Sequence, residues 1–191
     1  MKNFSGKKVA VLGFGLEGKD LCSFLFQQKA QITVFDQKEN FDNDQDYQKF
    51  KKEGVLFNLG LDSFKNDFKD FDVIFRSPGI KYFSPMINKA LKNKIKVSSA
   101  TKLFFELCQG KIIGVTGTKG KGTTATLIAE ILKNSQKKVF LAGNVGQPML
   151  SLLPKIDKDS WVVLELSSFQ LQDLDKSPKI GVVLFIASEH L

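Results

Sequence analysis

Residues 114–124 read Gly114-Val115-Thr116-Gly117-Thr118-Lys119-Gly120-Lys121-Gly122-Thr123-Thr124. An apolar run at 111–115 precedes this stretch, and a helix-like segment at 124–132 follows it. A glycine-rich turn between a strand and a helix presents backbone N–H groups to an anion, and the helix dipole favours negative charge at the same place. The stretch therefore predicts a phosphate-binding loop, with a nucleoside triphosphate as its ligand.

The loop departs from the common G-x-x-x-x-G-K-[ST] pattern at two positions. Val115 stands where the first glycine is usual, and Gly122 stands where a serine or threonine usually follows the lysine. We expect Lys121 to lie along the terminal phosphates and Thr123 to hold Mg²⁺, with Thr124 as the alternative hydroxyl. The residues expected to bind the nucleoside triphosphate are Gly117, Thr118, Lys119, Gly120, Lys121, Gly122, Thr123 and Thr124. A glycine-rich turn without a ligand is the alternative interpretation, but packing alone does not explain this lysine and these hydroxyls.

Composition limits the classes of protein to which the chain can belong. It has 191 residues, 42% hydrophobic and 25% charged, as in ordinary soluble globular proteins of one or two domains. No run of about 18 apolar residues occurs, and the N-terminus lacks signal-peptide architecture, so we expect a cytoplasmic protein with no membrane partner. The net charge of +8 comes from dispersed lysines and Arg76 is the only arginine, which argues against nucleic acid as a partner. Cys22 and Cys108 are far apart and the chain has one histidine, which excludes the usual zinc spacings.

Short apolar runs alternate with helix-like segments along the whole chain. The expected strands are residues 8–12, 32–35, 73–75, 95–97, 111–115, 138–141, 161–166 and 180–186, and the expected helices include 19–28, 85–92 and 102–108. Strands rich in Val, Ile and Leu that alternate with helices predict an α/β fold with parallel sheets covered on both faces. The polar segment 36–46 is expected to be a surface loop. Because one parallel sheet usually carries one phosphate-binding turn, two such turns predict two domains, residues 1–109 and 110–191.

The other glycine-rich turn, Gly13-Phe14-Gly15-Leu16-Glu17-Gly18, follows the first expected strand. It matches G-x-G-x-x-G, and Asp36 ends the next strand, where an acidic residue can bind a ribose hydroxyl. This pattern is typical of NAD-binding proteins, but it indicates only a backbone that approaches a diphosphate, and UDP-linked sugars carry the same group. The turn Ser77-Pro78-Gly79 follows another strand and would line the same crevice, although an ordinary β-turn is an equally good interpretation.

Together these motifs resemble those of the Mur ligases, which build peptidoglycan precursors, and most closely those of the D-glutamate-adding members. The resemblance rests on the two glycine-rich turns, on Ser77-Pro78-Gly79-Ile80, on Gly143-Asn144-Val145-Gly146-Gln147-Pro148, and on Leu164-Glu165-Leu166-Ser167-Ser168-Phe169-Gln170-Leu171. The last two motifs are the most specific. The resemblance implies a Rossmann-like N-terminal sheet that binds a UDP-sugar, then an incomplete P-loop-type ATPase domain, with the family's C-terminal domain absent.

The resemblance also implies a reaction. With ATP and Mg²⁺, the carboxylate of UDP-N-acetylmuramoyl-L-alanine would be activated as an acyl phosphate, which the amine of D-glutamate then attacks. These small molecules are the implied partners, and we expect a monomer. The implied catalytic residues are Lys121, Asn144, Glu165 and His190, and the implied metal ligands are Thr123, Glu165 and His190. The implied UDP-sugar-binding residues are Gly13, Gly15, Leu16, Glu17, Asp36, Lys38, Ser77, Pro78 and Gly79.

Some residues depart from the family pattern. Glu17 replaces a small hydroxyl residue and puts a carboxylate close to the expected diphosphate. Glu189 precedes His190 where an aspartate is usual. Since the family's proteins are much longer than 191 residues, we expect no ligase activity from this chain alone. The alternatives are a folylpolyglutamate synthase, another Mur ligase, a non-catalytic nucleotide-binding module and an NAD-dependent oxidoreductase.

Overall fold

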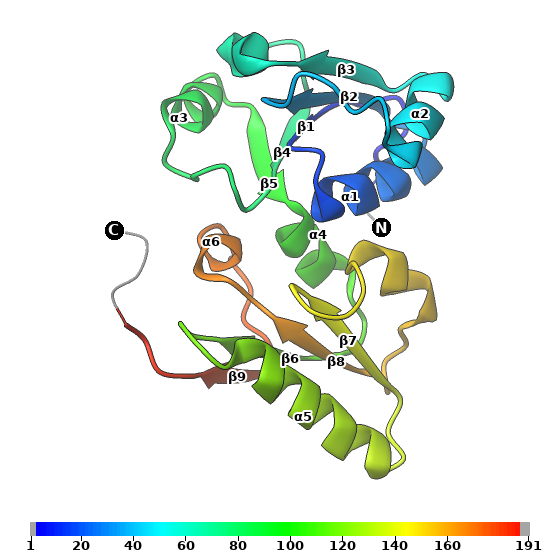
Figure 1. Ribbon diagram of the computed structural model, residues 1–191, viewed down its shortest axis with the longest axis vertical. Coiled ribbons are helices and arrows are strands. Elements are labelled where there is room, and N and C mark those ends of the chain that lie inside the picture. The colour runs from blue at the N-terminus through cyan, green and yellow to red at the C-terminus, as the bar shows by residue number, and fades with distance from the viewer. Residues whose placement is uncertain (1–2, 188–191) are drawn as a thin grey trace. The chain divides into compact units, whose positions relative to one another are not determined.

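The computed structural model describes residues 3–187 of the chain. Two compact units make up the chain, residues 1–100 and residues 101–191, and each has its own sheet (Figure 1). The division falls at the first residue of helix α4 (Ala100–Leu107), slightly before the expected boundary at residue 109. Both sheets are parallel, which confirms the predicted α/β fold class.

The first unit contains a five-stranded sheet in the order β3-β2-β1-β4-β5. Its elements are β1 (Lys8–Leu12), α1 (Leu16–Gln27), β2 (Gln31–Asp36), α2 (Gln45–Lys52), β3 (Leu56–Leu59), the short 3-10 helix η1 (Leu61–Lys65), β4 (Val73–Arg76), α3 (Pro85–Lys92) and β5 (Lys96–Ser99). The strand order reverses between β1 and β4, because β2 and β3 continue on one side and β4 and β5 on the other. Such a reversal leaves a crevice at the carboxyl ends of the two strands, where ligands bind in open α/β sheets.

Helices cover both faces of this sheet, with α1 and α3 on opposite sides (Figure 1). Ala10 and Leu12 of β1 belong to a core with Ile87 and Ala90 of α3. Helix α1 covers the other face and buries Cys22, and this burial raises the pKa of the thiol. A thiol in such an apolar environment is an unreactive packing residue.

Five aromatic rings hold the first glycine-rich turn against α2 and β3. Phe14, inside the turn, is buried, and its ring centroid lies 5.1 Å from that of Phe57 and 5.3 Å from that of Phe41. Phe50 lies 6.2 Å from Phe14, and Tyr47 lies 4.6 Å from Phe57. Edge-to-face pairs at these distances add stability beyond their buried area. The turn is therefore anchored through its own side chain.

The structure also contains α2 and β3, which the sequence pattern does not predict. Helix α2 begins at Gln45, inside the segment expected to be a surface loop, and buries Tyr47 and Phe50. Strand β3 has four residues that are exposed or half-buried. Neither segment shows a clear apolar period, because each has only a few positions that face the core.

The second unit contains a four-stranded sheet in the order β7-β8-β6-β9. Its elements after α4 are β6 (Lys111–Thr116), α5 (Lys121–Asn134), β7 (Val139–Gly143), the 3-10 helix η2 (Leu150–Lys155), β8 (Trp161–Glu165), α6 (Ser168–Leu171) and β9 (Ile180–Val183). Helix α5 lies along one face of the sheet (Figure 1), where Ala125 and Ala129 pack with Ile113, Val115 and Val163. The connection from β6 places the start of α5 at the carboxyl edge of the sheet.

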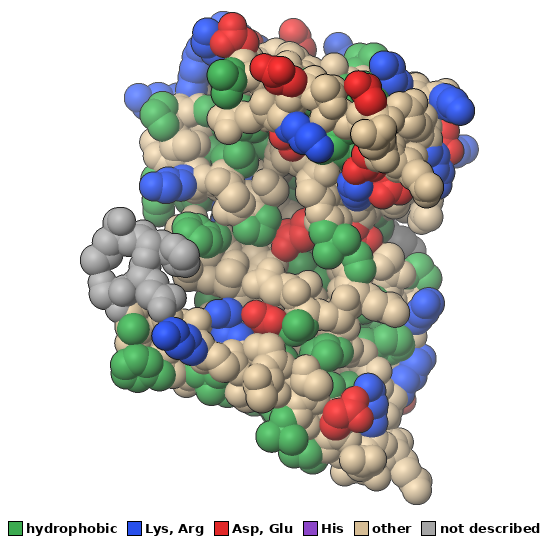
Figure 2. Space-filling view, in the orientation of Figure 1, with side chains coloured by type: hydrophobic (Ala, Val, Ile, Leu, Met, Phe, Trp, Pro, Cys, Tyr) green, Lys and Arg blue, Asp and Glu red, His purple; other side chains and the backbone are tan. Residues whose placement is uncertain are grey.

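Lysine side chains are interspersed with Asp and Glu side chains on the face drawn in Figure 2. This arrangement matches the dispersal of lysines along the sequence. In the described part of the chain, none of the helices is long and apolar enough to cross a bilayer.

Asp157 stabilises the loop that leads into β8. Its carboxylate pairs with Lys138 and accepts hydrogen bonds from the backbone N–H and the hydroxyl of Ser160, at 2.9 and 2.8 Å. The hydrogen bond with Lys138 is the main reason that the pKa of Asp157 falls from 3.8 to about 2. A depressed carboxyl pKa stabilises the folded state above the ordinary pKa, and that contribution is lost as the pH falls through the folded-state value.

We therefore expect Asp157→Asn to lower the melting temperature at neutral pH. The difference from the wild type should narrow as the pH falls from 3.8 to about 2, since the wild-type carboxylate becomes protonated in that range. Fluorescence of Trp161, the only tryptophan, reports the unfolding of the unit. Asp159→Asn is the matched control, because Asp159 is an exposed neighbour in the same loop. A difference that is constant across this pH range would contradict the prediction.

Candidate functional site

The two motifs of the first unit meet at the carboxyl ends of β1 and β4. Leu12 and Arg76 are register partners at these ends, and the N–H of Ser77 donates to the carbonyl of Leu12 at 2.9 Å. Gly13 has a φ of +95°, and a Cβ atom there would lie 2.5 Å from Ser77 Oγ. The glycine-rich turn and the Ser-Pro-Gly turn are therefore in contact where the strand order reverses.

Helix α1 begins at this contact with uncapped N–H groups. Gly15 is the N-cap residue and is exposed, and no side chain among residues 3–187 caps the helix start. Gly18 packs against the turn, since a Cβ atom there would lie 2.1 Å from the carbonyl oxygen of Gly13. Leu16, beside Gly15, is 63% exposed. Open N–H groups at the start of a 12-residue helix form an anion-binding position.

Asp36 supports the first turn through its carboxylate. Oδ2 accepts a hydrogen bond from the N–H of Phe14 at 2.7 Å, and Oδ1 accepts one from the N–H of Lys38 at 2.9 Å. The ammonium of Lys38 lies 4.5 Å from the centroid of the Phe41 ring. Glu17 is half-buried in the first turn of α1. Asp36 thus has a structural role that the dinucleotide pattern does not include, while its contact with a ribose stays a prediction.

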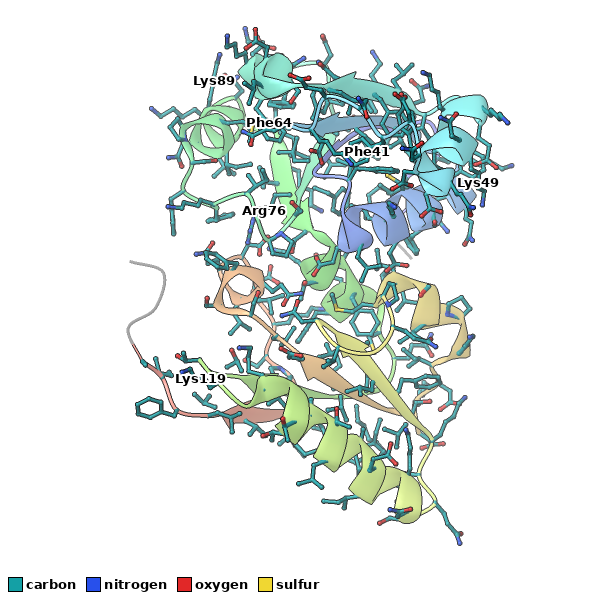
Figure 3. All side chains as sticks on the ribbon, viewed as in Figure 1. Phe41, Lys49, Phe64, Arg76, Lys89 and Lys119 are labelled. Atoms are coloured by element: carbon teal, nitrogen blue, oxygen red, sulfur yellow. The ribbon has the colours of Figure 1, made fainter. Side chains whose placement is uncertain are left out.

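Arg76 is a residue of this site whose role sequence reasoning missed. Its Nη1 donates to the carbonyl of Ile80 at 3.1 Å, and the N–H of Ile80 donates to the carbonyl of Ser77 at 3.0 Å. Its Cζ lies 5.4 Å from the centroid of the Tyr82 ring. Arg76, at the end of β4 (Figure 3), therefore holds the Ser-Pro-Gly turn closed. The sequence feature that could indicate this role is the position of the only arginine, directly before that turn.

A cavity of about 540 Å³ lies beside the Ser-Pro-Gly turn. Gly79 and Ile80 line it from the turn, Gln37 lines it from the residues after β2, and Phe64 lines it from η1 (Figure 3). Three lysines also line the cavity, namely Lys65, Lys81 and Lys89. Positive charge next to the switch-point turns suits a phosphorylated ligand.

The loop that the sequence predicts to bind phosphate joins β6 to α5 in the second unit and is called the phosphate loop below. Gly120 is the N-cap of α5 with a φ of +83°, and no side chain in the described part of the chain caps this helix start. The ammonium of Lys121 donates to the carbonyl of Thr118 at 3.1 Å. The N–H of Thr118 donates to the carbonyl of Phe185, and its hydroxyl accepts from the N–H of Ala187, both at 2.9 Å. The segment after β9 therefore fixes the loop while the start of α5 is left open.

Glu165 ends β8 beside the start of α5. The residue is 9% exposed, and a Cβ atom at Gly122 would lie 3.2 Å from its Oε2. The carbonyl of Glu165 accepts a hydrogen bond from the N–H of Asn144 at 3.3 Å, which places the turn after β7 at the same edge. Within residues 3–187 the carboxylate of Glu165 has no hydrogen-bond or ion-pair partner. A nearly buried carboxylate at an anion-binding helix start suits a divalent cation that arrives with phosphates.

The other expected residues of this site are more solvent-exposed. Asn144, Thr123 and Lys119 (Figure 3) are exposed, and Thr124 is half-buried. His190 lies outside the described residues. In the described range no three His, Cys, Asp or Glu side chains come together as a metal site. Mg²⁺ commonly takes one or two carboxylates together with substrate phosphates, so a single carboxylate beside the phosphate loop fits Mg²⁺–ATP.

Three other helices begin with side-chain caps. The carboxylate of Asp44 caps α2, and the hydroxyls of Ser84 and Ser167 cap α3 and α6. In α6, Gln170 Oε1 also accepts from the N–H of Ser167 at 2.7 Å and completes a capping box. Helices α1 and α5, which follow the two glycine-rich turns, differ from these in leaving their N–H groups open to a ligand.

Two family models match the chain, and both describe parts of Mur ligases. Residues 7–99 match the model "Mur ligase MurD-like, N-terminal domain", and residues 115–191 match the model "Mur ligase middle domain". The chain belongs to the Mur ligase family. The family resemblance is thereby confirmed, and each matched segment contains one of the two glycine-rich turns.

Among its relatives, the UDP-N-acetylmuramoylalanine--D-glutamate ligase of Acetivibrio thermocellus is 41% identical to this Mur ligase chain over 190 residues. The protein of the same name from Clostridium acetobutylicum is 38% identical over 192 residues. Each match covers 100% of the chain, which spans 41% of the relative's length. Among solved structures, the UDP-N-acetylmuramate:L-alanyl-gamma-D-glutamyl-meso-diaminopimelate ligase from Neisseria meningitides has a TM-score of 0.54 at 18% identity. That match covers 97% of this chain and 62% of the other, and it supports the fold alone.

We expect Gly18→Ala to destabilise the first unit. The added Cβ atom would meet a backbone carbonyl at 2.1 Å, and a backbone oxygen cannot rotate away as a side chain can. Overpacking of this kind costs about 1–3 kcal/mol. Thermal unfolding followed by circular dichroism measures the effect. Gly181→Ala is the control, because within residues 3–187 no atom lies within 4 Å of a Cβ atom there. Equal melting temperatures for the two variants would contradict the prediction.

Proposed function

We propose that this chain carries the UDP-sugar site and the ATP site of a ligase that adds D-glutamate to UDP-N-acetylmuramoyl-L-alanine. The observation that carries the proposal is the pair of uncapped helix starts, at Gly15 and Gly120, each at the carboxyl edge of its own parallel sheet. The names of the two relatives supply the chemistry of the substrates. Since the chain spans 41% of their length, ligation is proposed for the protein as a whole, and substrate binding for this chain.

The phosphate loop of the second unit is assigned to ATP. The N–H groups at the start of α5 and the ammonium of Lys121 bind the phosphates, and Glu165 binds Mg²⁺. In the whole protein, the carboxylate of the muramoyl-alanine would take the γ-phosphoryl group of ATP and release ADP. The amine of D-glutamate would then attack the acyl carbon and displace phosphate. Phosphoryl transfer needs positioning and neutralisation of charge more than covalent participation by the protein. The ammonium of Lys121, the open amides of α5 and the nearly buried carboxylate of Glu165 can position the phosphates and neutralise charge in this way.

The crevice of the first unit is assigned to the UDP-sugar. The start of α1 at Gly15 binds the diphosphate, and the contact between Gly13 and Ser77 sets the edge of the site. Arg76 acts indirectly, by holding the turn that ends at Ile80. The lysine-lined cavity beside Gly79 accommodates a further part of the same ligand.

The proposed reaction also indicates the partners, the cellular location and the oligomeric state of the protein. Its partners are the two small-molecule substrates and ATP with Mg²⁺. We assign it to the cytoplasm, as a monomer, since these substrates are polar and each site of this chain is built within a single unit.

Gly15→Ala should remove binding of the UDP-sugar without unfolding the chain. Gly15 has a φ of −76°, and no atom of the described residues lies within 4 Å of a Cβ atom there, so the fold tolerates the change. The added methyl group stands where the diphosphate must approach the backbone. UDP-N-acetylmuramoyl-L-alanine at about 100 times its Kd should raise the melting temperature of the wild type by roughly 5–10 °C, and that of the variant much less.

Gly181→Ala is the matched control and should keep the full shift. NAD is tested in parallel with the UDP-sugar. A shift with NAD and none with the UDP-sugar would overturn the proposal and make this crevice a dinucleotide site.

Lys121→Met should weaken binding of Mg²⁺–ATP by about tenfold or more, because a charge-assisted contact with phosphate is lost. Isothermal titration calorimetry measures the affinity, and binding of the UDP-sugar to the same variant should not change. Lys137→Met removes an exposed lysine outside the loop and serves as the control. Equal ATP affinity in the Lys121 and Lys137 variants would contradict the assignment of the loop.

A further inference from the structure

The residue that follows the loop lysine departs from the common phosphate-loop pattern. In the common phosphate loop this residue is a serine or threonine whose hydroxyl binds Mg²⁺. Here it is Gly122, and a Cβ atom at this position would lie 3.2 Å from Glu165 Oε2 and 3.6 Å from Val145 Cγ1. The carboxylate of Glu165 therefore lies against the side of α5 from which the usual hydroxyl would project.

The threonines that follow lie on other sides of the helix. Successive residues of an α-helix are about 100° apart around its axis, so Thr123 and Thr124 lie about 100° and 200° from Gly122. Their exposure agrees with this geometry, since Thr123 is exposed and Thr124 is half-buried, while Ala125 packs in the core. Thr126 shares the side of Gly122 but lies one turn farther from the loop, about 6 Å along the axis.

Glu165 has the properties of a cation ligand. The residue is 9% exposed, and within residues 3–187 its carboxylate has neither a hydrogen-bond nor an ion-pair partner. Removing most of the water around a carboxylate is costly, and the positive end of the α5 dipole offsets part of that cost. The group therefore lies beside the phosphate loop, and no side chain or backbone group of residues 3–187 occupies its oxygens.

We propose that, within the described residues, Glu165 alone provides the side-chain ligand for the nucleotide's divalent cation, and that no loop hydroxyl shares this role. A water molecule would then bind the cation in place of the missing hydroxyl. This inference rests on the proposed ATP site and differs from the sequence-based expectation that Thr123 is a ligand. Its consequence is a chain that needs more Mg²⁺ for nucleotide binding than it would with a hydroxyl at position 122.

The test measures the Mg²⁺ concentration that gives half of the maximal affinity for the fluorescent ATP analogue mant-ATP, followed by anisotropy with the full chain. Glu165→Gln should raise this concentration roughly tenfold to hundredfold, because the negative charge of the ligand is removed. Thr123→Val should leave it unchanged within about twofold. Melting curves followed through Trp161 show that each variant is folded.

Gly122→Ser is the gain-of-function variant, and Gly122→Ala is its matched control. Both must move the Glu165 carboxylate by a few tenths of an ångström, but only serine restores a hydroxyl. The serine variant should need several-fold less Mg²⁺ than the alanine variant.

Two results would overturn the inference. One is a Thr123→Val variant whose Mg²⁺ requirement rises as much as that of Glu165→Gln. The other is a serine variant that needs no less Mg²⁺ than the alanine variant. If the wild-type chain binds no mant-ATP with or without Mg²⁺, the proposed ATP site fails, and the ligand assignment fails with it.

Discussion

Backbone N–H groups at the start of a helix have no partner within the helix, and this constraint organises both candidate sites of the chain. A side-chain cap is the ordinary solution, and Asp44, Ser84 and Ser167 provide it for α2, α3 and α6. Helices α1 and α5 begin instead at glycines, which supply no capping side chain. These two helices therefore lack the stabilisation that a capping side chain provides. The start of each lies at the carboxyl edge of a parallel sheet. A helix start without a capping side chain is expected where a bound ligand accepts the hydrogen bonds of the open N–H groups.

Close packing keeps the two open helix starts in place. In the first unit, Gly13 leaves room for Ser77, and Gly18 lies against the carbonyl of Gly13. Asp36 reinforces the same turn through the N–H of Phe14, whose ring is fixed by its aromatic neighbours. In the second unit, the segment after β9 binds Thr118, while α5 packs on the sheet through its alanines. The amides that would face a ligand are thereby held before the ligand arrives, which reduces the entropy lost on binding.

Much of the fold follows from local sequence patterns. The apolar runs predict β1 and α3 with the observed bounds, because buried parallel strands are continuous apolar runs and Ser84-Pro85 marks a helix start. The pattern fails for α2 and β3, where few residues face the core. Chain order alone does not indicate that Glu165 lies against Gly122, or that Asp36 binds the N–H of Phe14. Those contacts depend on the register of strands and on turns far apart in sequence, so motifs predict the residue types of the site but not its geometry.

The most direct test of the account is a set of amide chemical-shift spectra of the ¹⁵N-labelled chain. They would be recorded alone, with UDP-N-acetylmuramoyl-L-alanine, and with ATP and Mg²⁺. Since each site is an open helix start, the UDP-sugar should shift the amides of residues 13–18, and the nucleotide those of residues 117–123. Amides that do not move in these two segments, while either ligand binds elsewhere, would contradict the central claim that the uncapped starts of α1 and α5 are the binding sites.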